Sequence, residues 1–122
     1  MRVASPVTFM RRTATQTATV GDHEFLEGDK VVLLYGAANR DPREFDDPEL
    51  FDARRDPNPH IGYGGPGPHF CLGAHLARYE MRAMFHALLP VLPKLELASE
   101  PELVAGSLHV GGIKRMMIRA AS

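Results

Sequence analysis

One cysteine lies at the junction between a glycine-rich loop and a predicted helix. Cys71 is the only cysteine of the chain, and five of the eleven glycines lie between residues 62 and 73. Backbone N–H groups and the positive end of a helix dipole stabilise a thiolate over a thiol. Glycines also let a backbone approach a flat cofactor closely. The placement predicts a reactive or ligating thiolate, and the alternative is a small buried hydrophobic residue.

The glycine loop satisfies the pattern G-x-G-x-x-G between Gly62 and Gly67. A dinucleotide-binding loop of this type follows a buried strand. The preceding residues include Pro57 and Pro59, which a central strand does not accommodate. A phosphate-binding P-loop requires Gly-Lys-Ser/Thr, which does not follow the glycines. The sequence therefore excludes both nucleotide-binding interpretations.

The segments on either side of Cys71 differ in proline content and in the spacing of their apolar residues. Six of the ten prolines lie between residues 42 and 68, which predicts an irregular segment with solvated charges. Residues 72–89 contain no proline, carry apolar residues at helical spacing and are followed by Pro90. We therefore expect an irregular loop that delivers the cysteine to the start of an amphipathic helix.

The N-terminal part of the chain is predicted to form β structure. Residues 8–16 are rich in threonine, and residues 21–23 and 27–29 have turn composition. The apolar run 31–35 predicts a buried strand paired with its neighbour. Near the other end, residues 108–113 predict a hairpin with a Gly-Gly turn.

Composition excludes several classes of protein. The 122 residues are 44% hydrophobic and 24% charged, with a formal net charge of −1, as in one small soluble domain. No basic patch predicts nucleic-acid binding, and no apolar run is long enough for a membrane span. One cysteine excludes an internal disulfide and a multi-thiolate zinc site. We expect a cytoplasmic chain with no nucleic-acid or membrane partner.

Residues 62–78, with the sequence GYGGPGPHFCLGAHLAR, resemble the heme-binding loop of cytochrome P450 monooxygenases. The matching positions are Gly67, His69, Cys71, Gly73, Leu76, Ala77 and Arg78. The aromatic residue, Tyr63, lies one residue further from the cysteine than in the commonest form of the motif. A similar longer loop occurs in some actinobacterial members that act on steroids or lipids.

The resemblance extends over nearly the whole chain and implies an α+β class, as the C-terminal part of the mainly-α cytochrome P450 fold. It divides the chain into a β-rich segment (1–36), a meander (37–60), the cysteine loop (61–73), a helix (73–90) and a C-terminal hairpin region (91–122). The chain would then be about one third of a larger fold.

The family implies heme b (iron protoporphyrin IX) as cofactor and assigns a role to each matching residue. Cys71 would be the axial thiolate ligand of the iron, with Tyr63 shielding its sulfur. His69 and Arg12, or its neighbour Arg11, would contact the propionates, and His60 would either contact a propionate or cap the loop. The predicted cofactor-binding set is Arg12, His60, Tyr63, Gly67, His69, Cys71 and Gly73.

Two arginines resemble a second family motif. Arg2 occupies the Arg position of Glu-x-x-Arg, and Arg55 would pair with that Glu/Arg couple, unless it is a surface arginine. The Glu of this motif and the oxygen-activating helix are not recognised in the sequence. We therefore expect a chain that is inactive by itself, and we assign no catalytic residue.

The resemblance implies the heme-binding portion of a monooxygenase that inserts one oxygen atom from O2 into a small lipophilic substrate, such as a steroid or fatty acid. A ferredoxin-type electron donor is implied in the same way. The alternatives are a non-catalytic heme-thiolate binding module and an inert truncated remnant.

Overall fold

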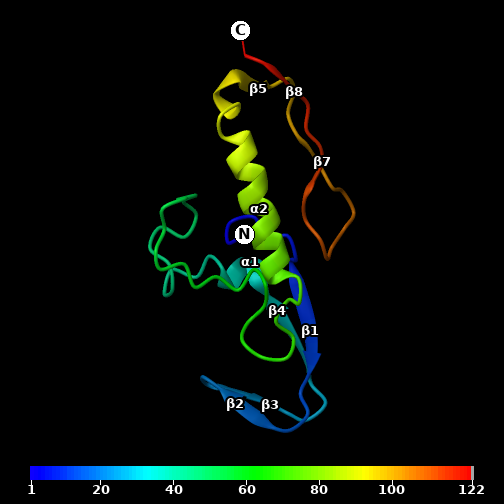
Figure 1. Cartoon of the computed structure of the whole chain (residues 1–122). Coiled ribbons are helices and arrows are strands. Elements are labelled where there is room, and N and C mark those ends of the chain that lie inside the picture. The colour runs from blue at the N-terminus through cyan, green and yellow to red at the C-terminus, as the bar shows by residue number, and fades with distance from the viewer. Residues whose placement is uncertain (122) are drawn as a thin grey trace. The chain divides into compact units, whose positions relative to one another are not determined.

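The computed structural model describes residues 1–121, and this part of the chain forms two compact units (Figure 1). The first unit comprises Met1–Gly62 together with Leu108–Gly111, and the second comprises residues 63–107 and the C-terminal stretch from Gly112. Across the described residues, the strands form four antiparallel pairs. No helix in that part is long and apolar enough to cross a membrane.

The first unit contains two of these pairs and a short helix. Strand β1 (Phe9–Thr13) pairs with β4 (Lys30–Leu34), and β2 (Ala18–Val20) pairs with β3 (His23–Phe25). The turn between β2 and β3 begins at Gly21, whose φ of +60° suits glycine, so the predicted turn is confirmed. Helix α1 (Tyr35–Ala38) follows β4 directly.

A strand forms over most of the predicted run 31–35, as β4, but Tyr35 begins α1 and the expected burial of the strand is wrong. The strand pairs with β1 and not with β3, the strand that precedes it along the chain. It is mostly exposed: the side chain of Leu34, for example, is 57% accessible. A two-stranded sheet covers neither of its own faces, so an apolar run can pair correctly and still remain open to solvent.

The predicted hairpin at residues 108–113 is also wrong. Val110 forms a bridge with Val7, and the Gly111 N–H donates to the carbonyl of Pro6 at 2.7 Å. Ile113 belongs instead to a strand that pairs with Leu103. Gly111 and Gly112 therefore connect the two units, because pairing partners far away in sequence take both arms of the expected hairpin.

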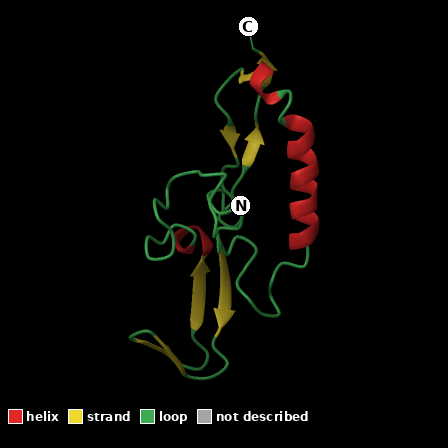
Figure 2. Cartoon of the chain, turned by 60° about the vertical axis from the view of Figure 1, so that its left-hand side comes forward, coloured by secondary structure: helices red, strands yellow, loops and turns green. Residues whose placement is uncertain are grey.

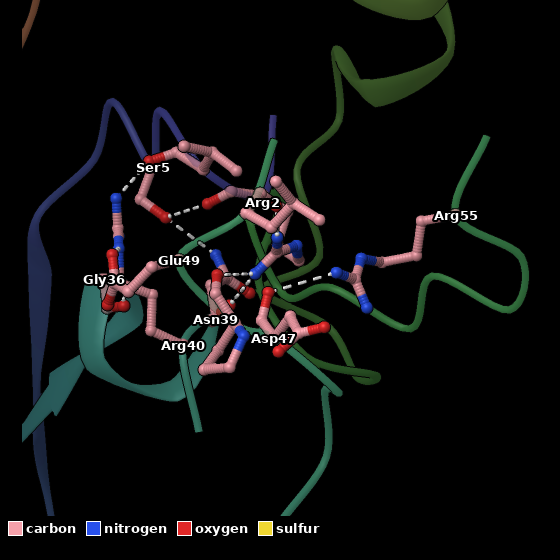
Figure 3. A network of polar contacts seen from close by, with 11 residues as sticks. Arg2, Ser5, Gly36, Asn39, Arg40, Asp47, Glu49 and Arg55 are labelled. Atoms are coloured by element: carbon pink, nitrogen blue, oxygen red, sulfur yellow. Dashed lines mark hydrogen bonds and ion pairs between the residues drawn. The ribbon is translucent and has the colours of Figure 1, made fainter. Parts of the chain in front are cut away.

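The core of the first unit is small and largely polar. Its buried side chains are those of Arg2, Ser5, Tyr35, Asn39 and Phe45. The Asn39 side chain has no exposed surface; its Nδ2 donates to Ser5 Oγ and its Oδ1 accepts from the Ile61 N–H, both at 2.8 Å. Ser5 Oγ in turn donates to the Arg2 carbonyl at 2.7 Å. Figure 3 shows Ser5, Asn39 and Arg2 in contact at the centre of this cluster.

The second unit is built on helix α2 (Ala74–Leu88), drawn in Figure 2 as the long red helix. The helix predicted over 72–89 is confirmed; it begins after Gly73, at the end of the cysteine loop. The 3-10 helix η1 (Leu92–Lys94) leads to strand β5 (Leu95–Leu97), which pairs with β8 (Ile118–Ala120). Strand β6 (Glu102–Leu103) pairs with β7 (Ile113–Arg115). Tyr63 and Ala74 are the buried apolar residues of this unit within the described chain.

Candidate functional site

The loop before α2 presents Cys71 to solvent as a free thiol. Its own N–H donates to the carbonyl of Tyr63 at 2.9 Å, and its carbonyl accepts from the Ala74 N–H at 3.1 Å. Both backbone groups of Cys71 are therefore used within the loop and the first turn of the helix. The interpretation of Cys71 as a buried hydrophobic residue is wrong, because the residue is exposed.

Glycines shape the loop at two points. Gly67 has a φ of +127°, which side chains rarely adopt, and its carbonyl accepts from the Phe70 N–H at 3.1 Å. A Cβ at Gly73 would lie 4.0 Å from the sulfur of Cys71 and meet no other atom within that distance. Gly67 thus permits the turn, and Gly73 leaves the space beside the sulfur open.

Tyr63 is the anchor at the other end of the loop. Its side chain is 7% exposed, and the guanidinium carbon of Arg78 lies 4.5 Å from the centre of its ring. Arg78 lies on α2, so this contact joins the start of the loop to the helix that follows it. Sequence reasoning used Arg78 only as a motif position and did not predict its contact with Tyr63.

Arg12, His60 and His69, the other predicted site residues with polar side chains, differ in exposure and in hydrogen bonding. Arg12, on β1, is half-buried and donates from Nη1 to the Arg11 carbonyl at 3.0 Å, whereas Arg11 is exposed. His60 Nδ1 accepts from the Gly62 N–H at 3.1 Å, a loop-capping contact. His69 is exposed.

The structure divides the predicted set between the two units. Arg12 and His60 belong to the first unit, and Tyr63, Gly67, His69, Cys71 and Gly73 belong to the second. Direct contact is seen between Tyr63 and Cys71 through their backbone groups. Across the described residues, no group of three His, Cys, Asp or Glu side chains could hold a metal ion.

Arg2 is a buried cation whose visible partners are neutral. Its guanidinium donates to the carbonyls of Asn39 at 2.9 Å, Pro48 at 2.6 Å and Leu50 at 2.8 Å. It also lies over the ring of Phe45, 5.0 Å from the ring centre. Burial, followed by the charges of Arg55 and Arg40, lowers the pKa of Arg2 from its ordinary value, and Glu49 opposes this effect.

Arg55 lies near Arg2, as Figure 3 shows. Its Nη2 donates to the Asp47 carbonyl at 3.2 Å, and its Nε is buried without a hydrogen-bond partner. Between residues 1 and 121, the ion pairs do not include Arg2 or Arg55; Glu49, for example, pairs with Arg40 at 3.1 Å. Two close cations with an unsatisfied buried donor are a chemical fit for a carboxylate, since buried charges are ordinarily paired.

Comparisons with known proteins show the family to which the chain belongs. The family model "Cytochrome P450" matches residues 1–91. The methyl-branched lipid omega-hydroxylase of Mycobacterium tuberculosis is 47% identical over 119 residues, which cover 97% of this chain and 27% of that protein. The steroid C26-monooxygenase of Rhodococcus jostii is 43% identical, over 97% of this chain and 25% of that protein.

Solved structures show the same relationship. P450BioI in complex with an acyl carrier protein ligated to hexadec-9Z-enoic acid aligns with a TM-score of 0.90 and 35% identity, over 98% of this chain and 31% of that one. A cytochrome P450 of Mycobacterium marinum in complex with pseudoionone aligns with a TM-score of 0.88 and 44% identity, over 96% and 28%. A mixed helix–strand chain with one cysteine at a loop-to-helix junction thus matches cytochrome P450 structures along almost all of its length.

The chain belongs to the cytochrome P450 family and has part of the P450 fold. The resemblance predicted from residues 62–78 is confirmed at the level of the family. The chain spans about a quarter of the length of the curated relatives that it matches, 27% and 25% in the two cases above.

Proposed function

We propose that this chain is the heme-thiolate portion of a cytochrome P450 monooxygenase and that Cys71 is the axial ligand of heme b iron. The observation that carries the proposal is an exposed, free thiol in the loop that leads into α2, in a chain of this family. When bound, a thiolate-ligated heme supplies oxygen activation, because thiolate donation favours O–O cleavage. The residues present fit this group, since the thiol is accessible and Gly73 leaves the space beside it open.

The other loop residues have supporting roles in this proposal. Tyr63 shields the sulfur and accepts the Cys71 N–H, and Gly67 provides the turn between them. His69 is an exposed donor suited to a propionate. Arg12, or Arg11, and His60 are proposed as further propionate contacts, although His60 already has a loop-capping role. The division into β-rich segment, meander, cysteine loop, helix and hairpin region also stays a prediction.

The Arg2–Arg55 pair is proposed to receive the carboxylate of the family's Glu-x-x-Arg motif. The support is the buried guanidinium of Arg2, whose hydrogen-bond acceptors among the described residues are all carbonyls, and the buried Nε of Arg55, which has no hydrogen-bond partner there. A carboxylate at this position would oppose the burial, and the charges of Arg55 and Arg40, that lower the pKa of Arg2.

For the whole enzyme, we propose a small lipophilic substrate such as a steroid or fatty acid, and a ferredoxin-type electron donor. The substrate class is supported by the names of two relatives, one acting on methyl-branched lipids and the other on steroids. The donor is supported only by membership of the family.

We further propose that these 122 residues do not turn over substrate by themselves. Cys71 is open to solvent and the adjacent Leu72 is fully exposed, so water would reach a heme held by this chain alone. Heme proteins use the polarity and access of the pocket to select oxygen activation. Product formation from a steroid or fatty acid by the isolated chain, with ferredoxin and its reductase, would contradict this.

Titration of the chain with hemin, followed by reduction and addition of CO, tests the ligand. We expect one heme per chain and the red-shifted Soret band of thiolate ligation. Cys71→Ser should lose that band completely because it removes the only thiol. Thiolate ligation without turnover, even after the remaining part of a relative is supplied, would favour the non-catalytic module; no heme binding would favour the inert remnant.

The propionate role of His69 needs a separate comparison. His69→Ala should lower the affinity for hemin while leaving the Soret band in its thiolate position, because the sulfur is untouched. His75→Ala is the matched control, since His75 is another exposed histidine, on α2, with no proposed role. Equal hemin affinity in the two variants would remove His69 from the site.

A further inference from the structure

A cation–π contact brackets the cysteine loop. Tyr63 lies eight residues before Cys71 and Arg78 lies seven residues after it. The guanidinium carbon of Arg78 is 4.5 Å from the centre of the Tyr63 ring, within the range in which such contacts are attractive. The contact therefore joins the two ends of the segment 63–78, which contains Cys71.

The low solvent exposure of both side chains strengthens this contact and its effect on the conformation of the loop. Tyr63 is 7% exposed and Arg78 is half-buried, and shielding from water strengthens a cation–π interaction. Within the described residues, Arg78 forms no ion pair, so its charge is not neutralised by a carboxylate there. The ring face of Tyr63 is its identified electrostatic partner.

The backbone of the same tyrosine holds the cysteine directly. The Tyr63 carbonyl accepts the Cys71 N–H at 2.9 Å, so any movement of Tyr63 also moves the acceptor of that bond. Arg78 lies on α2, which begins at Ala74 after the N-cap residue Gly73 and has no side-chain cap. The cation–π contact thus links the Cys71 backbone to the helix through Tyr63.

We propose that Arg78 and Tyr63 act as a clamp that sets the conformation of the Cys71 loop before any cofactor binds. They are positioning residues, because they act on the sulfur through the loop and not through contact with a reacting atom. The clamp is a property of the heme-free chain. Its consequence for a heme thiolate rests on the function proposed above.

The chemistry of the contact makes the proposal specific. A positive charge and an aromatic face are required, whereas the Tyr63 hydroxyl is not. Arg78→Lys and Tyr63→Phe should therefore keep most of the loop order, and Arg78→Met and Tyr63→Leu should lose it. The double variant Arg78→Met/Tyr63→Leu should be little worse than either single variant, because both remove one interaction.

Hydrogen exchange of the Cys71 amide in the heme-free chain measures the clamp. We expect exchange to accelerate about three- to tenfold in Arg78→Met and in Tyr63→Leu. Arg82→Met on the exposed face of α2 and Tyr79→Leu, also exposed, are the matched controls. Additive effects in the double variant, no rescue by lysine, or equal effects in the controls would overturn the proposal.

Hemin binding separates this inference from the proposed function. If Cys71 ligates heme, Arg78→Met should reduce the fraction of the ferrous CO complex that shows the thiolate Soret band, and Arg78→Lys should restore it. If the exchange data show coupling and no thiolate band forms in the parent chain, the clamp stands and the heme proposal fails. If the band forms and exchange is unchanged in every variant, the clamp is refuted and the heme proposal stands.

Discussion

The cluster around Asn39 and the loop around Cys71 differ in burial and in the kind of hydrogen bond that holds each of them. Asn39 is fully buried, and its amide bonds to Ser5 and Ile61, which are 34 and 22 residues away in sequence. Cys71 is exposed and is held by a local backbone hydrogen bond to Tyr63. The first region satisfies its polar groups internally, while the second leaves its most reactive atom open.

This difference shows where ligand chemistry is possible in each region. The Asn39 side chain donates from Nδ2 to Ser5 Oγ and accepts the Ile61 N–H at Oδ1, so its role is structural. Both backbone groups of Cys71 form hydrogen bonds within the loop and the first turn of α2, and its side chain is exposed to solvent, where a ligand can reach it. Within and beside the Asn39 cluster, Arg2 is buried and Arg55 has a buried Nε without a hydrogen-bond partner, and among the described residues neither arginine forms an ion pair.

The largest effect is expected at Asn39. Asn39→Ala leaves Ser5 Oγ without its donor and the Ile61 N–H without its acceptor, which should lower the free energy of unfolding by about 2–4 kcal/mol. Urea unfolding followed by circular dichroism measures the change. Asn58→Ala, at an exposed loop position, is the control. A similar loss in both variants would mean that the Asn39 cluster does not hold the first unit together.

The next largest effect is expected at Gly67, where a substitution tests the backbone conformation of the cysteine loop. Gly67→Ala forces a side chain into a φ of +127° and should cost about 1–3 kcal/mol, although the added Cβ meets no atom within 4 Å. Gly65→Ala is the matched control, because Gly65 also has open space and lacks a positive φ. Exchange of the Phe70 amide, which donates to the Gly67 carbonyl, reports the effect on the loop. Equal effects at the two glycines would show that the turn is not strained.

A smaller effect, of the opposite sign, is expected at Arg55. Burial and then the charge of Arg55 lower the pKa of Arg2, so Arg55→Gln should relieve the repulsion between the two arginines and stabilise the heme-free chain by about 0.5 kcal/mol. Arg54→Gln, at the adjacent exposed arginine, controls for the general loss of positive charge. Thermal unfolding of both variants at low and high salt separates the Arg2–Arg55 repulsion from the general loss of positive charge, since salt screening weakens the repulsion. A clear destabilisation by Arg55→Gln would show that the pair is already compensated.

The smallest effect concerns an exposed pair outside both regions. The Arg43 side chain, by hydrogen bonding to Asp41, lowers the pKa of that carboxyl to about 2. Because the folded pKa lies below the ordinary value, the stabilisation is present above about pH 4 and is lost as the pH falls towards 2. Asp41→Asn should flatten this part of the curve of melting temperature against pH. Asp22→Asn, in an exposed turn, should leave the curve as it is.

Local sequence patterns predicted the elements near the site well. Glycine and proline spacing predicted an irregular segment, and apolar periodicity predicted the helix that became α2. The turns at 21–23 and 27–29 were correct for the same reason, because turn preference depends on the residues within the turn. These features need only short-range information.

Pairing and burial were predicted less well because they depend on distant residues. The apolar run at 31–35 paired with β1 and remained exposed, and the arms of the expected hairpin at 108–113 paired with Val7 and Leu103 instead. Asn39 was not singled out, since an asparagine near a predicted loop is more often a turn residue than a buried link. Nor did sequence spacing indicate that Arg78 would lie over Tyr63.

By itself, the sequence determined the family and the position of Cys71 at the entrance to a helix, because a motif and a helix start are local patterns. Only the tertiary structure decided that the thiol is exposed and that its N–H is taken by Tyr63. It also decided that Arg2 is buried among carbonyls while Arg55 keeps an orphaned Nε. Exposure, charge compensation and ring contacts follow from which segments meet in space, and that is set by packing and hydrogen bonding over many residues.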